Sequence, residues 1–207
     1  MSQEVKESSP KDNYGLRSYS YADYLTWPED TPVELIEGIP YTMTTPMRIH
    51  QEVVGEVLRQ IANYLVDKPC KVYVAPFDVR LADVKAKADA ITNVVQPDIA
   101  IICDKEKLDD KGCLGSPDLI AEVVSPSSAA KDYIEKLNLY EKYSVREYWI
   151  IHPMDKIAMV YQLEQTGKFS RSTIYSFEET IPVGIFEDLT ISLAKISQEL
   201  SAEQYIP

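Results

Sequence analysis

The sequence of 207 residues lacks several features that mark large classes of protein. Glycine is scarce, with seven residues, and no cluster of them could form the phosphate-cradling loop of a nucleotide-binding protein. No apolar run approaches the roughly 18 residues that a membrane-spanning helix needs. The sequence begins MSQEVKESSPKDN, which is polar and lacks the apolar stretch of a secretory signal. We therefore expect a cytoplasmic protein with no membrane partner.

Cysteine is also scarce, and Cys70, Cys103 and Cys113 do not have the paired spacing of zinc ligands. An odd number of cysteines without a secretory signal is typical of the reducing cytoplasm. Cys70 and Cys103 lie in apolar stretches that resemble strands. We expect both to be small, unpaired residues of the core.

Positive charge is in short supply: 21 lysines and arginines stand against 33 aspartates and glutamates, a net charge of -12. This balance argues against tight nonspecific binding to nucleic acid. A nucleic-acid contact would need a local group of cations near the site. The candidates are Arg48, Arg59, Lys131, Lys136 and Arg146.

The chain has the length of one domain, which we place at residues 18–207, after a mobile leader at residues 1–17. Apolar residues recur at helical spacing in 47–66 and in 128–143. Short helices are expected at 18–25 and near the C-terminus, where residues 189–200 form a short strand followed by a helix. The expected strands lie at 33–38, 39–43, 70–75, 77–81, 98–103, 118–125, 147–153, 157–164 and 169–177.

This order of elements predicts an α+β fold in which helices flank a mixed sheet. Hydrophobic residues make up 45% of the chain, which is enough for a sizeable core. Tyr140 and Trp149 lie on apolar faces, and we expect both in that core.

Two aspartates follow prolines at the start of apolar runs, Asp98 in VVQPDIAIICD and Asp118 in GSPDLIAEVVSPSS. If these runs pair as antiparallel strands, the start of one lies beside the end of the other. Asp98 then lies about 5 Å from Glu122, whereas Asp118 lies about 13 Å from Glu122 on the same strand, near Cys103. Asp98 and Glu122 are the candidate pair, and Asp118 is a turn residue.

Two carboxylates at that separation repel each other unless a cation lies between them. Mg²⁺ binds carboxylate oxygens and keeps water ligands, and a bound ion polarises phosphate oxygens and acidifies its water. The alternative is that Asp98 caps a turn and Glu122 pairs with a lysine. The apolar neighbours of Glu122 in AEVV weaken this alternative, because charged residues are rarely buried without a partner.

Several segments together carry a family resemblance: ELIEG (34–38), PMRIH (46–50), VQPDIAIICD (95–104), PDLIAEVVSPSS (117–128), DYIEKLNLY (132–140) and VREYWIIHP (145–153). On these segments, from about residue 18 to 196, the chain resembles the Uma2 family within the PD-(D/E)XK nuclease superfamily. The resemblance implies a restriction-endonuclease-like core, with a mixed sheet flanked by helices and a metal-dependent site for phosphodiester hydrolysis. Asp98 and Glu122 would be the catalytic metal ligands, with Mg²⁺ or Mn²⁺ as cofactor.

The superfamily's lysine, two residues after the glutamate, is replaced here by Val124. Lys136 matches the lysine of the family's D-x-x-x-K-x-x-x-Y pattern and would reach the same place from the next helix. There it would orient water or stabilise charge on phosphate. The alternative is a surface ion pair of Lys136 with Asp132, four residues apart on the helix.

Three further residues are candidates for the site. Glu37 precedes a glycine as an accessory catalytic acid does in the family, and Glu34 is the alternative on the opposite strand face. His50 opens the long helix at a family histidine position and would bind substrate. Asp78 would support the site from a neighbouring strand.

The resemblance therefore implies a Mg²⁺- or Mn²⁺-dependent DNA endonuclease, which an exposed sheet edge would allow to form a homodimer. A catalytically inactive interaction protein with the same fold is one alternative, favoured by the missing strand lysine and the acidic composition. A metal phosphoesterase that acts on a smaller substrate is the other.

Overall fold

The computed structural model describes residues 17–28, 32–83, 85–125 and 128–203, so the leader expected at residues 1–17 lies outside the described residues except for Arg17. The main sheet has six strands in the order β12-β11-β10-β9-β6-β3. Their bounds are β3 (Lys71–Val74), β6 (Ile99–Ile102), β9 (Leu119–Val123), β10 (Glu147–His152), β11 (Ile157–Gln162) and β12 (Thr173–Ser176). The sheet is mixed, because β9 and β10 are parallel and the other neighbours are antiparallel.

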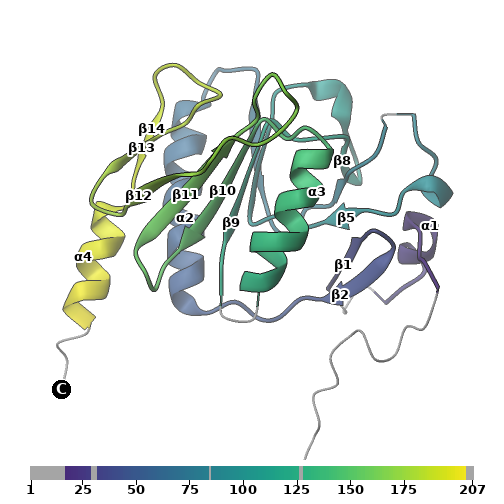
Figure 1. Ribbon diagram of the computed structural model, residues 1–207, viewed down its shortest axis with the longest axis horizontal. Coiled ribbons are helices and arrows are strands. Elements are labelled where there is room, and N and C mark those ends of the chain that lie inside the picture. Colours follow the sequence, from purple (N-terminus) through teal and green to yellow (C-terminus); the bar gives the residue numbers. More distant parts are fainter. Residues whose placement is uncertain (1–16, 29–31, 84, 126–127, 204–207) are drawn as a thin grey trace, which may run out of the picture.

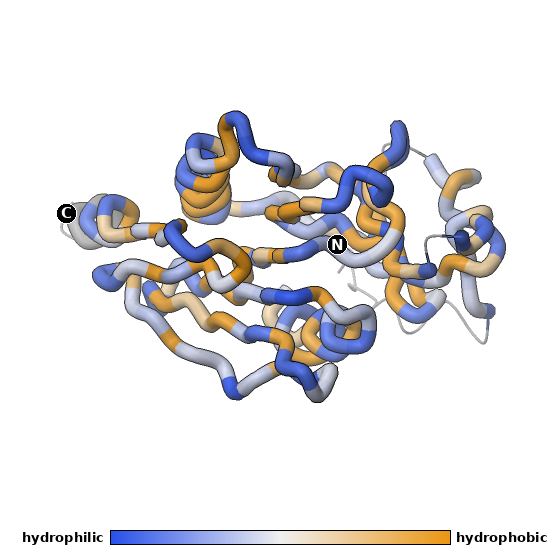
Figure 2. The backbone as a smooth tube through the Cα atoms, turned by 90° about the horizontal axis from the view of Figure 1, so that it is seen from above, coloured by the Kyte–Doolittle hydropathy of each residue, from blue (hydrophilic) through white to orange (hydrophobic). Residues whose placement is uncertain are grey.

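Helices cover both faces of the main sheet (Figure 1). On one face lies α2 (Arg48–Tyr64), and on the other lie the π-helical turn η4 (Lys131–Lys136) and α3 (Leu137–Lys142). Seen from above, α2 and α3 lie on opposite sides of the strands (Figure 2). The segment 128–143 also connects the parallel strands β9 and β10, which cannot be joined by a tight turn.

Strand parity assigns each residue of β6 and β9 to one of these two faces, since successive side chains of a strand point to opposite sides. Ile99 and Ile101 pack with Val57 and Ile61 of α2. Ile120 packs with Leu139 and Tyr140 of α3. Glu122, two residues after Ile120, therefore points toward the α3 face.

A second six-stranded sheet, in the order β2-β1-β5-β4-β8-β7, packs beside the main one. Its strands are short, and three of them form outside the segments that the sequence predicts as strands. The bounds are β1 (Val33–Ile36), β2 (Ile39–Thr42), β4 (Val79–Arg80), β5 (Val94–Val95), β7 (Leu108–Asp109) and β8 (Gly112–Leu114). Glu37 and Gly38, with φ of 50° and 78°, form the two-residue turn between β1 and β2, as the sequence predicts.

The remaining elements close the two ends of the molecule. Ser20 and Asp23 form a capping box at the start of α1 (Tyr21–Tyr24), which covers the second sheet. The hairpin of β13 (Thr180–Pro182) and β14 (Thr190–Ser192) packs on the α2 side of the main sheet and leads to α4 (Ala194–Glu203). Two short 3₁₀ turns, η2 (Ala88–Ala90) and η3 (Lys105–Lys107), lie in the connections. None of the described helices is long and apolar enough to cross a membrane.

The prediction that Cys70 and Cys103 are unpaired is wrong. They form a disulfide, because the register of β3 and β6 pairs Lys71 with Ile102 and so places the flanking cysteines opposite each other. The sequence contains no signal for this register. The bonded pair removes the argument for a reducing compartment that rested on unpaired cysteines. Cys113 is free and buried, and burial raises the pKa of its thiol to about 12.

Candidate nuclease site

The antiparallel pairing of β6 and β9 brings Asp98 beside Glu122. The register pairs Ile99 with Ala121. Because the strands are antiparallel, Asp98, which precedes Ile99, lies beside Glu122, which follows Ala121. The Val123 amide donates to Asp98 Oδ2 at 2.7 Å, and the Asp98 amide lies 3.4 Å from Glu122 Oε2. The adjacency predicted from the two Pro-Asp motifs is confirmed.

The second Pro-Asp motif serves the structure at the other end of β9. Asp118 Oδ2 accepts a hydrogen bond from the Cys103 amide at 2.8 Å, and its Oδ1 pairs with Arg146 at 3.0 Å. Asp118 thus holds the end of β6, as its predicted position beside Cys103 implies.

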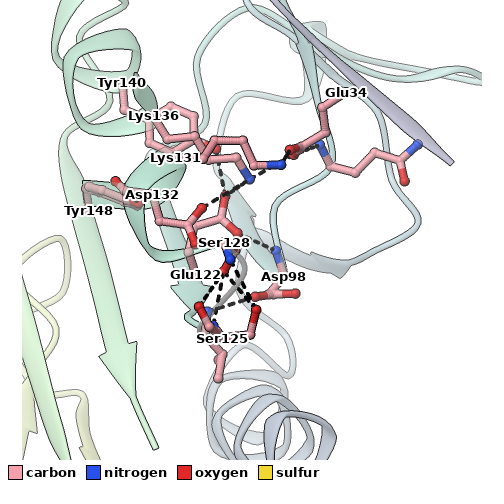
Figure 3. Close-up of polar contacts among 12 residues, drawn as sticks. Glu34, Asp98, Glu122, Ser125, Ser128, Lys131, Asp132, Lys136, Tyr140 and Tyr148 are labelled. Carbon is pink, nitrogen blue, oxygen red and sulfur yellow. Dashed lines mark hydrogen bonds and ion pairs between the residues drawn. The ribbon is translucent and has the colours of Figure 1, made fainter. Parts of the chain in front are cut away.

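Lys136 reaches Glu122 from the helix, as expected for a lysine that replaces the missing strand position. Its Nζ lies 2.8 Å from Glu122 Oε1 and 2.8 Å from Glu34 Oε1 (Figure 3). The Lys136 side chain is only 4% exposed, so the surface ion pair with Asp132 is ruled out as its main contact, although Asp132 Oδ1 lies 3.7 Å away. Val124, at the superfamily's lysine position, is buried in the core.

The π-helical turn η4 explains how three residues of one helix reach the same place. In a π-helix the hydrogen bonds run from residue i to i+5, so residues five apart lie on nearly the same side of the helix. In an α-helix, residues five apart diverge by about 140°. Lys131 and Lys136 therefore both face Glu34 (Figure 3), and Asp132 Oδ1 lies 3.7 Å from the Lys136 ammonium.

Glu34, and not Glu37, is the acidic residue of β1 that belongs to this cluster. Glu34 is 1% exposed, and its two oxygens pair with Lys131 and Lys136. Glu37 lies in the exposed turn after β1 and pairs with Lys142 at 3.0 Å. The expected position of Glu37 in the site is thus corrected: β1 turns Glu34 inward, and the chain has left the strand before it reaches Glu37.

His50 lies in the first turn of α2, against Asp98. Its Nε2 is 3.1 Å from Asp98 Oδ2. Its Nδ1 is buried and has no hydrogen-bond partner among the residues that the structure describes. His50 therefore contacts the carboxylate pair directly, whereas its expected contact with substrate stays a prediction.

These residues line a pocket of about 470 Å³. Its polar wall is formed by Glu34, His50, Gln96, Asp98, Glu122, Lys131, Asp132 and Lys136. Asp78 supports the pocket indirectly, because its Oδ1 accepts hydrogen bonds from Gln96 Nε2 at 2.9 Å and from the Tyr24 hydroxyl at 3.2 Å.

The charges in the pocket are unevenly matched. Burial raises the pKa of Glu122 above its usual value, and the nearby carboxylates of Asp132 and Asp98 raise it further, against the opposing effect of Lys136. Burial also opposes the ionisation of Glu34, but Lys136 and Lys131 outweigh it and lower the pKa of Glu34. Glu122 is thus the carboxylate with too little positive charge around it.

The donor set fits a divalent cation of the Mg²⁺ type. Among the described residues there is no cluster of three or more metal-binding side chains, but Mg²⁺ often uses only one or two carboxylates and completes its shell with water and phosphate oxygens. Asp98 Oδ1 accepts no hydrogen bond from the described part of the chain, and Glu122 Oε2 has only the long contact with the Asp98 amide. Asp98 and Glu122 would hold the ion.

The cations expected near the site are only partly there, and the protein's own acids neutralise them. Of the five candidates, Lys131 and Lys136 line the pocket, whereas Arg146 lies with Asp118 at the other end of β9. Arg48 pairs with Glu52, Arg59 with Glu56, Arg146 with Asp118, and both lysines with Glu34. These contacts leave the surroundings of the site less basic than the five residues alone suggest.

The sequence prediction missed the roles of Lys131, Asp132 and Tyr140 in this cluster. Tyr140 was expected only in the core, yet its hydroxyl donates a hydrogen bond to Glu122 Oε1 at 2.8 Å. Tyr140 follows Lys136 by four residues, so both side chains lie on one helix face. This spacing could have predicted that Tyr140 reaches Glu122 together with Lys136. Trp149 is buried in the core as predicted.

A mixed sheet flanked by helices, with a carboxylate pair and a lysine in one pocket, defines a nuclease-type α+β fold. The chain belongs to the Uma2 family, described as "Putative restriction endonuclease", whose family model matches residues 21–194. A solved structure similar to this chain is a "putative nuclease belonging to DUF820" from Anabaena variabilis, with a TM-score of 0.70 and 17% identity. That match covers 87% of this chain and 98% of the other, and at this identity it shows the fold alone.

A search of the curated proteins finds no match. The resemblance and the α+β fold expected from the sequence are both confirmed.

Proposed function

We propose that this protein is a Mg²⁺- or Mn²⁺-dependent endonuclease that hydrolyses phosphodiester bonds in DNA. One observation carries the proposal: Asp98 and Glu122 lie side by side in a pocket, with the Lys136 ammonium 2.8 Å from Glu122. Membership of the Uma2 family supports the same reaction class.

Asp98 and Glu122 would hold the cation, which would supply polarisation of a phosphate oxygen and a more acidic bound water. Lys136 has three N–H donors, and two of them go to Glu122 and Glu34. The third would orient the attacking water or stabilise charge on the phosphate. Glu34 would keep the ammonium in place, and His50 would orient Asp98.

The hydrolysis needs no further reactant. The water oxygen forms a bond to phosphorus, and the P–O bond to the leaving nucleotide breaks. One proton of the water is released to solvent, and the leaving oxygen takes up a proton. In-line attack requires the phosphate to enter the pocket next to Asp98 and Lys136.

The test is nicking of supercoiled plasmid with Mg²⁺ or Mn²⁺ by the wild type, Asp98→Asn and Asp118→Asn. Asp118→Asn is a matched control, since it makes the same substitution in the second Pro-Asp motif, outside the pocket. Asp98→Asn should lower the nicking rate by at least about 100-fold, the range of losses found when a key electrostatic group is removed. Equal rates for the wild type and Asp98→Asn would falsify the assignment of the site.

One other candidate is a metal phosphoesterase that acts on a smaller substrate. It is favoured by the size of the pocket and by the ion pairs that neutralise the candidate cations for DNA binding. A pocket of about 470 Å³ is large enough for a small phosphodiester, and such a substrate needs no extended basic surface. Hydrolysis of bis(p-nitrophenyl) phosphate without plasmid nicking would support it. Absence of both activities, together with absence of metal binding by calorimetry, would support an inactive interaction protein.

The quaternary structure in this proposal is a homodimer formed through an edge of the main sheet. The edge strands β3 and β12 each have one side without a partner strand among the described residues. Light scattering coupled to size-exclusion chromatography would give the mass directly.

A further inference from the structure

The buried hydroxyl of Tyr140 contacts the candidate metal carboxylate. It donates to Glu122 Oε1 at 2.8 Å, and Lys136 Nζ reaches the same oxygen at 2.8 Å. The two donors lie one turn apart on the helix that covers this face of the sheet (Figure 3). Oε1 is therefore occupied by two strong donors. Among the described residues, Oε2 has only the 3.4 Å contact with the Asp98 amide.

We infer that Tyr140 is a positioning residue of the site: it fixes the orientation of the Glu122 carboxylate so that Oε2 faces the Asp98 side as a ligand for a divalent cation. The inference rests on the proposed function. Hydrogen bonds to a metal-binding carboxylate orient it, and their loss typically weakens metal binding about 10- to 100-fold.

Lys136 alone would not fix the orientation of the Glu122 carboxylate. Its ammonium is shared between Glu122 and Glu34, with Asp132 Oδ1 3.7 Å away, and it lies at the end of a flexible stem. The phenol of Tyr140 is rigid by comparison. Its ring is fully buried and packs edge-on against Tyr148, with centroids 4.9 Å apart and planes at 72°. Tyr140 therefore fixes both the place and the direction of its hydrogen bond.

Tyr148 provides a matched control. It is also fully buried, but its hydroxyl donates to the backbone carbonyl of Asp132 at 3.1 Å and not to a carboxylate. Tyr140→Phe and Tyr148→Phe thus remove the same atom from neighbouring rings. A purely structural role would make the two variants behave alike in metal binding.

The experiment titrates Mn²⁺ into the full chain of the wild type and of both variants, with calorimetry for affinity and water-proton relaxation for the waters on the bound ion. Tyr140→Phe should raise the Kd for Mn²⁺ about tenfold. It should also raise the relaxation enhancement per bound ion, because water replaces the misplaced Oε2. Tyr148→Phe should match the wild type in both measurements.

Two results would overturn this inference without affecting the proposed metal site. One is a Tyr140→Phe protein with the Kd and relaxation of the wild type, and the other is an equal loss of Mn²⁺ affinity in both variants. If the wild type fails to bind Mn²⁺ at all, the proposed metal site fails together with this inference. If Tyr140→Phe does not fold, the inference can be tested by NMR on the wild type. On saturation with Mg²⁺, the NMR signal of the Tyr140 hydroxyl proton should shift while that of Tyr148 stays, and an unmoved Tyr140 signal overturns the inference.

Discussion

Lys131 and Lys136 hold opposite oxygens of one buried carboxylate. Each ammonium lies 2.8 Å from Glu34, Lys131 at Oε2 and Lys136 at Oε1. The π-helical turn makes this possible, because it brings residues five apart to the same side of the helix. Glu34 therefore joins β1 of the second sheet to the helix that covers the main sheet, and it does so inside the pocket.

Loss of the Glu34 charge should destabilise the fold. In Glu34→Gln, two ammonium groups, one of them fully buried, lose their shared counter-charge, and breaking a buried ion pair in this way costs about 3–5 kcal/mol. Urea unfolding would measure the change. Glu37→Gln is the control from the same ELIEG segment, because its exposed pair with Lys142 should be worth less than about 1 kcal/mol. Similar losses in both variants would contradict the assigned role of Glu34.

Lys136 should be needed for activity beyond its role in stability. Lys136→Met removes the ammonium beside Glu122, and we expect nicking to fall about 100- to 1000-fold, as when one electrostatic donor of a transition state is removed. Lys142→Met, one helical turn and a half further along, removes an exposed ammonium that pairs with the turn residue Glu37 outside the pocket. Its nicking rate should equal that of the wild type. A Lys136→Met protein that is folded and fully active would show that the lysine is only structural.

The pH dependence of stability should report on Asp78. Burial raises the pKa of Asp78 above its usual value, so the folded state binds this proton more tightly than the unfolded state. Stability from this group is then greatest below the unfolded pKa, and it falls as pH rises from there through the folded pKa. Asp78→Asn can keep both hydrogen bonds, since Gln96 and Tyr24 donate to the same oxygen.

We therefore expect Asp78→Asn to match the wild type in stability at acidic pH and to exceed it at neutral pH. Chemical unfolding of both proteins across this range would show it. A difference that does not vary with pH would mean that ionisation of Asp78 does not affect the fold.

The sequence predicted the part of the site that depends on strand geometry. The antiparallel pairing of two apolar runs is enough to put Asp98 beside Glu122 and Asp118 beside Cys103, because strand spacing is nearly constant. Lys136 was found through the family pattern. The fold class followed from the alternation of helical and strand periodicities.

Other features depend on contacts between segments far apart in the chain. The choice of Glu34 over Glu37 depends on which face of β1 meets the helix, and parity alone left both open. The positions of Lys131 and Asp132 depend on a π-helical turn, which residue periodicity does not reveal. The Cys70–Cys103 disulfide depends on the register of β3 against β6, for which no turn signal exists.

The disulfide can be tested by counting thiols. Without reductant, the denatured protein should show one reactive thiol, from Cys113, and with reductant it should show three. The bond closes a loop with a sequence separation of 33, for which chain entropy gives about 3–4 kcal/mol of stability. A Cys70→Ser/Cys103→Ser variant should lose this amount in urea unfolding, and the reduced wild type should match the variant. Three thiols in the unreduced protein would contradict the pairing.

Binding to DNA should depend only weakly on salt. If the five candidate cations all contacted phosphates, the slope of log K against log salt concentration would be about -4.5. Because each of them is paired with a carboxylate of the protein, contact with phosphate gains little unless that pair opens. We expect a slope shallower than about -2. Fluorescence anisotropy of a labelled duplex, with Ca²⁺ held constant and NaCl varied, would measure it. A slope near about -4.5 would show that the ion pairs open when DNA binds and that the acidic partners regulate access to a basic surface.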